Sequence, residues 1–460
     1  MKKTLIWVLI FALLLSGVGF VGYKIWTLIE YRNAHIFVEE AAYAKDSTFL
    51  DLRNTGVSLE HYETVRSQLP DCEIRYDLPF QGGFYPDDTK ELKLSSLTAE
   101  EVALLDYLPQ LETVDARGCR DYAQLLALQQ RRPDCRVRYT VTILDQEYGE
   151  DTTELSFSGR EIQPDGLQQA LNLLPKVQTV HFVQPEIPVG DLVALREANP
   201  GLAVTWEKDA LGGTYRDDVT EIDLSGREDL TLEQVEQAFV WFPELEKVVM
   251  CDCGFDNETM AAFREKMRPQ YKVVWSLSIN GMKVRTDDTY FMPAKYGKEV
   301  TNYQAQQLIY CEDMICVDLG HMNIFNVEWV TGMPHLKYLI LADNDLMFIE
   351  PLSTCKELVY LELFMTWVND YTPLLGCTAL EDLNVAVSNG NPMVFKQMPW
   401  LKNLWVNRLG VTPRQHKELQ EALPNTRIES EHGWPTGNGW REVDNYFKMR
   451  DLLGMPYNSW

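Results

Sequence analysis

Residues 333–341, MPHLKYLIL, are the first of four copies of one phrase. The later copies are 355–363 (CKELVYLEL), 377–385 (CTALEDLNV) and 398–406 (MPWLKNLWV). Their second residues stand at positions 334, 356, 378 and 399, so the period is 22, 22 and 21 residues. A fixed period of this size predicts a solenoid, in which each repeat stacks on its neighbours.

Within each copy, apolar residues follow the pattern L-x-x-L-x-L. In the first copy they are Leu336, Leu339 and Leu341. Because strand side chains alternate between faces, the second and third of these residues are expected to point inward from a short strand. One copy cannot bury such a face alone. The copies are therefore expected to lie side by side and share one core.

These copies resemble the repeats of leucine-rich repeat proteins, and the resemblance covers most of the chain beyond Phe49. It implies an α/β fold, a solenoid with a ladder of parallel strands and with helices on the outer side. An asparagine is expected three places after the third apolar residue, and Asn344 supplies one. The equivalent positions of the other repeats hold different residues: Met322, Thr366, Ser388 and Leu409. The repeats are therefore irregular.

Between Phe49 and residue 300 the repeats are longer. Proline markers there are alternately separated by short and long intervals: Pro70, Pro109, Pro133, Pro175, Pro200, Pro243 and Pro269. Most of the long intervals contain alternating apolar residues around a Gly-containing turn, as at Gly82 and Gly83. This pattern predicts β-hairpins inserted between repeats. We expect the hairpins to leave one parallel ladder intact from Phe49 to Ile428.

The amino terminus contains an uncharged run from Leu5 to Tyr23 after Lys2 and Lys3. As a helix it would reach about 28 Å, close to the thickness of a hydrocarbon core. We therefore expect a signal anchor in a single-pass protein of the cell membrane, with residues 31–460 exterior. The lysines favour a cytoplasmic amino terminus. Cleavage of this segment would instead give a secreted protein.

These patterns divide the chain into five predicted parts. They are a transmembrane anchor (1–30), a juxtamembrane connector (31–48), long-period repeats with hairpins (49–300), short-period repeats (301–430) and an aromatic C-terminal cap (431–460).

The composition excludes some classes of protein. A 45% hydrophobic and 24% charged composition is typical of folded chains. The formal charge of −26 opposes contact with phosphate backbones, so we expect no nucleic-acid partner.

The sequence contains no recognisable catalytic or metal-binding motif, so we expect no enzyme activity, no cofactor and no metal. Among the nine cysteines, Cys355 and Cys377 hold the same place in two repeats, which favours buried thiols over disulfides. Aspartate pairs such as Asp87 with Asp88 recur with the hairpins. Calcium ligation and simple exposed turns are both open readings of these pairs.

The resemblance to bacterial surface leucine-rich repeat proteins implies a non-catalytic recognition role. The expected partner is a protein or a glycan of the cell envelope, with the membrane contacted through the N-terminal helix. Two alternatives stay open. One is a structural envelope protein that assembles with copies of itself, and the other is an anchored hydrolase with an unrecognised site.

The predicted ligand-binding residues lie at outward positions of the short repeats. They are Tyr338, Tyr360, Glu362, Phe364, Asn384 and Trp405. Strands in register would place Tyr338 beside Tyr360, and Glu362 beside Asn384 and Trp405. Clustered aromatic side chains on a rigid face are typical of binding surfaces. The alternative is that the C-terminal residues or a hairpin fold over this patch.

Overall fold

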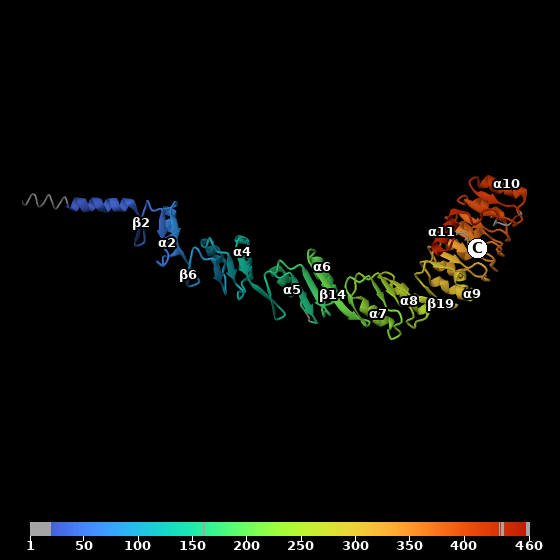
Figure 1. Ribbon diagram of the computed structural model, residues 1–460, viewed down its shortest axis with the longest axis horizontal. Helices are drawn as coiled ribbons and strands as arrows, with labels where there is room; N and C mark the ends of the chain where they lie inside the picture. The colour runs from blue at the N-terminus through green and yellow to red at the C-terminus, as the bar shows by residue number, and fades with distance from the viewer. Residues whose placement is uncertain (1–19, 160–161, 432, 434–436, 457–460) are drawn as a thin grey trace, which may run out of the picture. The chain divides into compact units, whose positions relative to one another are not determined.

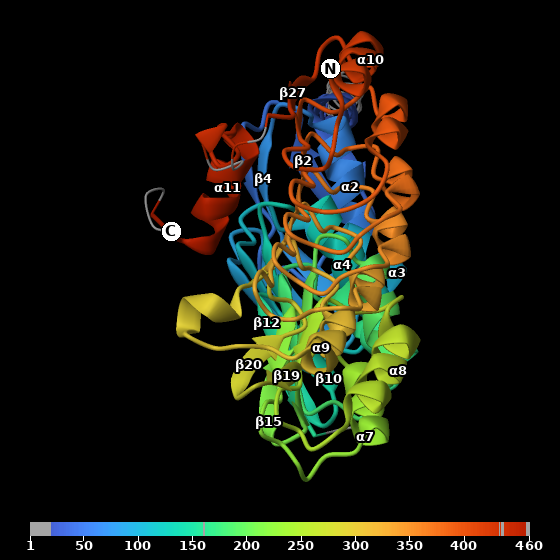
Figure 2. The same cartoon turned by 90° about the vertical axis from the view of Figure 1, so that its right-hand side faces the viewer.

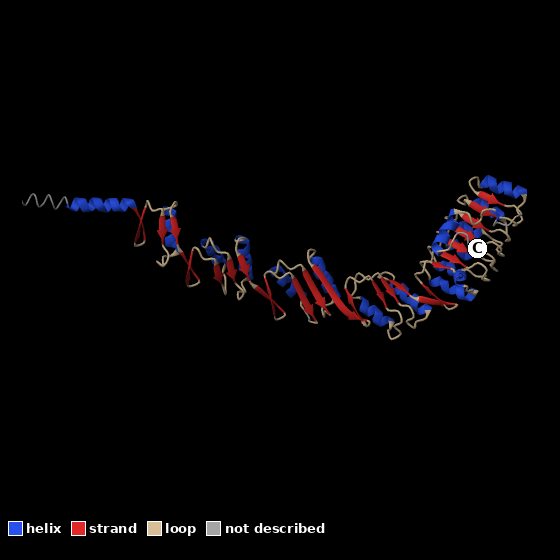
Figure 3. Cartoon of the chain, in the orientation of Figure 1, coloured by secondary structure: helices blue, strands red, loops and turns tan. Residues whose placement is uncertain are grey.

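The computed structural model describes residues 20–159, 162–431, 433 and 437–456 (Figure 1). The chain divides into two compact units, Met1–Trp206 and Glu207–Trp460. Short strands alternate with helices in both units (Figure 3).

In the first unit the parallel strands pair in small groups: β3 with β4, β7 with β8 and β9, and β12 with β13. The strands are β1 (His35–Val38), β2 (Ala41–Ala44), β3 (Phe49–Asp51), β4 (Glu73–Arg75), β5 (Asp77–Phe80), β6 (Gly83–Pro86), β7 (Glu91–Lys93), β8 (Thr113–Asp115), β9 (Arg136–Arg138), β10 (Thr140–Ile143), β11 (Gln146–Gly149), β12 (Glu154–Ser158), β13 (Thr179–Val183) and β14 (Ala203–Ala210), which continues into the second unit. The helices are α2 (Leu59–Gln68), α3 (Ala99–Leu104), η1 (Leu105–Tyr107), α4 (Tyr122–Arg131), α5 (Pro164–Leu173) and α6 (Val189–Ala198).

In the second unit β16, β17 and β18 form one parallel sheet, and β21 to β27 form a seven-stranded one, which we call the ladder. The strands are β15 (Gly213–Arg216), β16 (Glu221–Asp223), β17 (Lys247–Val249), β18 (Lys272–Val274), β19 (Ser276–Ile279), β20 (Met282–Arg285), β21 (Tyr290–Phe291), β22 (Cys316–Asp318), β23 (Tyr338–Ile340), β24 (Tyr360–Glu362), β25 (Asp382–Asn384), β26 (Asn403–Trp405) and β27 (Arg427–Glu429). The helices are α7 (Leu232–Phe239), α8 (Asn257–Met267), η2 (Pro293–Tyr296), α9 (Asn302–Ala305), η3 (Gln306–Tyr310), η4 (Glu328–Gly332), η5 (Glu350–Thr354), η6 (Thr372–Gly376), η7 (Pro392–Gln397), α10 (Pro413–Ala422) and α11 (Asp444–Leu453).

The ladder has the architecture of a leucine-rich repeat protein. The register pairs Val317 with Leu339, Leu339 with Leu361, and Leu361 with Leu383. All four side chains are fully buried. The central residue of each strand therefore points into one continuous core, as the L-x-x-L-x-L pattern predicts.

Repeat length decides which helix forms behind the ladder. In the ladder, strand centres 22 residues apart, such as 317 and 339, are connected through a five-residue 3-10 helix. The interval of 24 residues between positions 404 and 428 contains the ten-residue α10. The short helices also pack closely, because a Cβ on Gly332 would lie 1.9 Å from the carbonyl oxygen of Ile309.

The expected asparagine position is buried at Met322, Asn344, Thr366 and Ser388, and half-buried at Leu409. Asn344 accepts the backbone N–H groups of Met322 and Ile324 and donates to the carbonyl of Leu319. In later repeats, Thr366 and Ser388 both donate to the Leu363 carbonyl, at 2.8 Å. Where asparagine is absent, the hydroxyl groups of Thr366 and Ser388 thus donate to a backbone carbonyl of the corresponding turn.

The prediction of one uninterrupted ladder is wrong, because the antiparallel hairpins separate the parallel sheets. The hairpins are β5–β6, β10–β11, β14–β15 and β19–β20. In three cases, a single buried aromatic residue separates the end of a parallel strand from the first strand of the hairpin. These residues are Tyr76, Tyr139 and Trp275. The carbonyl of each of these aromatic residues accepts a backbone N–H from the far end of its hairpin. The chain therefore enters the hairpin directly, and a new sheet begins after it.

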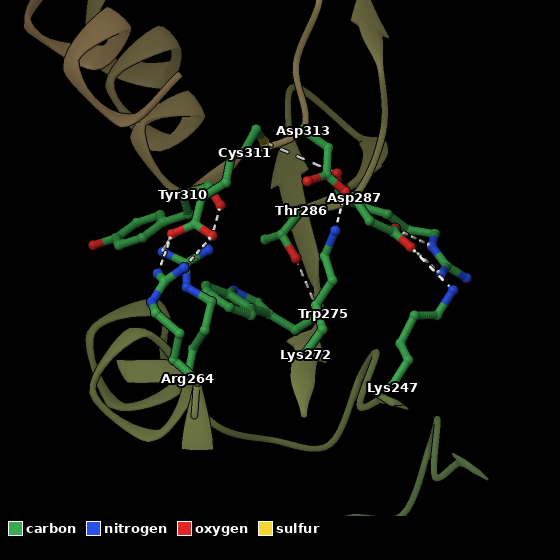
Figure 4. A network of polar contacts seen from close by, with 12 residues as sticks. Lys247, Arg264, Lys272, Trp275, Thr286, Asp287, Tyr310, Cys311 and Asp313 are labelled. Atoms are coloured by element: carbon green, nitrogen blue, oxygen red, sulfur yellow. Dashed lines mark hydrogen bonds and ion pairs between the residues drawn. The ribbon is translucent and has the colours of Figure 1, made fainter. Parts of the chain in front are cut away.

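A polar network crosses the last of these interruptions (Figure 4). Arg264 of α8 donates to the Tyr310 carbonyl at 2.8 Å, pairs with Glu312 at 3.1 Å and lies over the Trp275 ring at 4.9 Å. Lys272 of β18 pairs with Asp313. Because Tyr310, Glu312 and Asp313 follow the β19–β20 hairpin, the network connects the sheet before it to the ladder after it.

The prediction of a transmembrane helix in residues 1–30 is contradicted. Residues 1–19 lie outside the described part of the chain, and residues 20–34 are helical. The described helical residues include Lys24, Glu30 and Arg32. Among the described residues, no helix combines the length and apolarity needed to cross a membrane. The single-pass localisation and the membrane contact lose their support with it. The other predicted boundaries, near residues 48, 300 and 430, stay predictions.

Replacing Leu361 by Ala tests the shared core. The side chain is fully buried at the centre of β24, so the cavity should lower the free energy of unfolding by about 2–5 kcal/mol. The measurement is denaturant unfolding of the full chain. Tyr303→Ala, at a side chain that is 79% exposed, is the control and should stay within about 0.5 kcal/mol of wild type. Equal losses for the two variants would contradict the assignment.

Candidate functional site

The structure brings the predicted ligand-binding residues together on the ladder. The register places Tyr338 beside Tyr360, and Glu362 between Ile340 and Asn384. Asn384 pairs in turn with Trp405. Their side chains point away from the leucine core, on the face of the ladder opposite the short helices. We call this surface the ladder face.

The ladder face is covered by the C-terminal residues, one of the two arrangements left open by the sequence. Tyr360, Glu362, Asn384 and Trp405 are at most 1% exposed, Phe364 is 9% exposed, and Tyr338 is half-buried. We call the covering segment, residues 438–455 with α11, the strap. Figure 2 shows α11 across the ladder from α10. The role of these residues in ligand binding stays a prediction.

The strap runs back across the ladder from its last strands. At its start, the Asn438 carbonyl accepts the Trp405 Nε1–H at 3.0 Å. Trp440 packs against Phe364 with ring centroids 4.9 Å apart. At its end, Lys295 Nζ in η2 donates to the Leu453 carbonyl at 2.7 Å. The strap therefore crosses from β26 to the beginning of the ladder.

Charged and polar side chains lie at the centre of this interface. The Tyr360 hydroxyl donates to Glu362 Oε1, and Arg441 Nη2 of the strap donates to Glu362 Oε2 at 3.3 Å. Burial raises the pKa of Glu362, while the Arg441 charge opposes that shift. Asn445 Nδ2 donates to Asp382 Oδ2 at 2.8 Å, and burial also raises the pKa of Asp382.

Several buried polar atoms at this interface have no hydrogen-bond partner among the described residues. On the ladder they are Asn384 Nδ2 and Asn407 Oδ1, and on the strap they are Asn438 Nδ2 and Trp440 Nε1. A buried donor or acceptor without a partner costs about 1–3 kcal/mol. The strap therefore fills the ladder face without satisfying all of its polar groups.

A cavity of about 310 Å³ lies between η2, the start of the ladder and the strap. Asp318 of β22 lines it together with Ile340, Arg441 and Arg450. Asp318 Oδ1 accepts the Gly320 N–H at 3.1 Å. Withdrawal of the carboxylate from water raises its pKa, against the charges of Arg441, His321 and Arg450.

A second surface, which the sequence did not predict, lies on α9 and on the loops that follow β22, β23 and β24. Its large apolar side chains are between 47% and 79% exposed: Tyr303, Phe325, Met347, Phe348 and Trp367. We call them the loop row. The Tyr303 and Phe325 rings meet edge to face, with their centroids 6.2 Å apart. The backbone N–H of Trp367 donates to the Leu346 carbonyl at 2.9 Å. Phe325 and Met347 occupy the same place in successive repeats. That spacing was the sequence pattern from which this surface could have been predicted.

Beside Trp367 lies a polar hollow of about 430 Å³. Its lining includes Asn323, Asp345 and Asn389, which follow β22, β23 and β25. His321 Nδ1 lies 2.7 Å from Asp343 Oδ2 at its edge. The hollow thus combines one exposed indole with planar hydrogen-bonding groups.

The hairpin carboxylates largely pair with arginines. Arg75 pairs with both Asp87 and Asp88, at 2.8 Å, and Arg285 pairs with Asp287 at 2.8 Å. Within the described residues, no three His, Cys, Asp or Glu side chains are grouped as metal ligands. The arrangement favours the reading of these residues as turn carboxylates over calcium ligation.

All nine cysteines are free thiols, and eight of them are buried. Cys355 and Cys377 are both in the core of the ladder. This agrees with the prediction of buried thiols in place of disulfides.

No protein-family model matches the chain, and no curated protein matches it. Among solved structures, an internalin (InlF) of Listeria monocytogenes is 13% identical and aligns over 85% of this chain and 94% of its own, with a TM-score of 0.28. A leucine-rich repeat protein of Leptospira interrogans is 12% identical, with 73% and 93% coverage and a TM-score of 0.29. The fold assignment rests on the ladder itself, because TM-scores this low carry no weight.

Trp405→Ala should be strongly destabilising. The side chain is 1% exposed beneath the strap, so its removal should cost about 3–5 kcal/mol of unfolding free energy. Denaturant unfolding measures this loss. Trp367→Ala, at a 59% exposed indole, is the matched control and should cost less than about 0.5 kcal/mol. A near-neutral Trp405→Ala would show that the strap does not cover this position in solution.

Asp318→Asn should change how stability depends on pH. A carboxyl whose pKa is raised by folding stabilises the protein below its unfolded pKa, and that contribution is lost as the pH rises through the folded pKa. The variant should therefore gain stability relative to wild type between pH 4 and pH 7, as measured by denaturant unfolding at both values. Asp345→Asn, at an exposed position, is the control. A gain that shrinks as the pH rises would contradict the assignment.

Proposed function

We propose that this leucine-rich repeat protein is a non-catalytic binding protein and that it recognises a partner protein through the loop row. The observation that carries the proposal is the exposure of five large apolar side chains on consecutive repeats. Exposed large apolar side chains that recur on neighbouring repeats are typical of interaction sites. Aromatic residues among them suit the role of binding anchors.

The surroundings of the loop row indicate the chemistry of the partner. Exposed carboxylates lie next to it in the sequence: Glu328, Asp345, Glu350 and Asp370. The whole chain is strongly acidic, with a formal charge of −26. A partner with an apolar patch bordered by Lys or Arg would therefore complement this surface.

A glycan is the second candidate ligand, because of the polar hollow beside Trp367. Its amide, carboxylate and imidazole groups can hydrogen-bond to hydroxyl groups. An exposed indole supplies a flat apolar surface for the face of a sugar ring. Direct titration with neutral oligosaccharides, such as cellohexaose and maltohexaose, distinguishes this candidate from a protein ligand.

The double variant Phe348→Ala, Trp367→Ala tests the loop row. A photo-crosslinking amino acid at position 347 of the full chain, in its native cells, would first identify the partner. The double variant should then weaken the dissociation constant by more than about 30-fold, which corresponds to about 2 kcal/mol. Unfolding should change little because both side chains are exposed.

Phe84→Ala is the matched control, since Phe84 is 56% exposed on a hairpin of the first unit. Its affinity should equal that of wild type. Equal weakening by both variants would contradict a specific site. Concentration-dependent sedimentation that the double variant abolishes would assign the row to contacts between copies of the chain.

A further inference from the structure

The strap carries a recognisable pattern of side chains. It presents Trp440 and Arg441 before α11, and Asn445 and Tyr446 in the first turn of α11. Each contacts a predicted ligand-binding residue or its neighbour on the ladder: Trp440 meets Phe364, Arg441 meets Glu362, Asn445 meets Asp382 and Tyr446 meets Tyr360. The strap thus binds the ladder face in the way that a helical peptide occupies a groove.

The interface is specific but incompletely satisfied. Glu362 is fully buried and has a charged partner, Arg441, on the strap. Within the part of the chain that the structure describes, Asn384 Nδ2 and Asn407 Oδ1, one donor and one acceptor on the ladder face, have no hydrogen-bond partner, and neither has Trp440 Nε1 on the strap. A ligand that supplied hydrogen bonds to these groups would have an advantage over the strap.

The strap packs on the ladder through an apolar cluster separate from the ladder's own core. The second residue of the strap is Gly439. Gly439 has a φ of +72°, a left-handed conformation that favours glycine. The repeats of the ladder, by contrast, are joined through a common apolar core that the strap does not enter.

We propose that the strap is a displaceable competitor that occupies the ladder face, and that this face binds a helical segment of a partner protein. The segment carries an arginine for Glu362 and aromatic side chains for Tyr360 and Phe364. Its positive charge complements Glu362, Asp382 and Glu381, the carboxylates that the strap itself contacts. The site is separate from the loop row.

Hydrogen exchange of the full chain tests whether the strap opens. Amides of α11 should exchange at least about tenfold faster than those of β23 to β25, because they are released by local opening and not by global unfolding. Asn445→Ala, which removes the contacts to Asp382 and Glu381, should accelerate exchange in α11 alone. Equal protection of α11 and the ladder strands would overturn the proposal.

A synthetic peptide of residues 438–456 with a fluorescent label tests the face itself. Full-length Arg441→Ala and Asn445→Ala chains should each bind the peptide at least about tenfold more tightly than wild type, because their own straps compete less. A peptide carrying Arg441→Glu should not bind, since its carboxylate would face buried Glu362. Failure of the native peptide to bind either variant would overturn the proposal.

Two further observations distinguish a partner protein from a second copy of the chain and from the loop row. If displacement of the strap occurs only as the chain concentration rises, the occupant is the strap of a second copy and the partner-protein proposal is overturned. The Trp367→Ala chain should behave like wild type in both measurements. If the loop row binds no partner, the tests of the strap therefore stay valid. If the strap is not displaced, the test of the loop row stays valid.

Discussion

The structure depends on a constraint set by strands that are only three residues long. Each short ladder strand turns a single central side chain into the core, and the register aligns Val317, Leu339, Leu361, Leu383 and Leu404 into one column. A slip of one residue would turn that side chain to the opposite face. From Val317 to Leu404 the interval between strand centres is therefore 21 or 22 residues, and it is longer only at the two ends of the ladder, with 26 residues from Phe291 to Val317 and 24 from Leu404 to Ile428.

The hairpins show how the chain tolerates such interruptions. A hairpin that starts directly after a parallel strand removes the edge on which the next repeat would pair. A buried aromatic residue fills the corner, as Trp275 does, and the cation of Arg264 lies over its ring. Because Arg264 also holds the carbonyl of Tyr310 and the carboxylate of Glu312, polar contacts replace the missing ladder hydrogen bonds at this junction. Such a buried charge is stable only while its partners stay in place.

The period of the sequence predicted contacts between neighbouring repeats. It did not predict contacts between segments that are far apart in the sequence. The alignment of Tyr338 with Tyr360 followed from the 22-residue spacing alone. The contact between Arg441 and Glu362 spans 79 residues, and no pattern in either segment specifies the other. The loop row was missed for another reason. Phe325 and Met347 look like core residues in a sequence, and only the path of the loops turns them outward. The anchor prediction used the apolarity of Leu5–Tyr23, but the described helix continues through charged residues.

The buried cysteines give the fold a chemical property of its own. Burial raises the pKa of Cys355 to about 11 and those of Cys311 and Cys377 to about 12. Because the thiolate is the reactive form, these thiols are protected from alkylation and from disulfide exchange both by enclosure and by protonation. They lie at intervals along the core, so each becomes reactive only when its own repeat opens. The order in which these cysteines react with a thiol-specific label would thus give the order in which the repeats unfold.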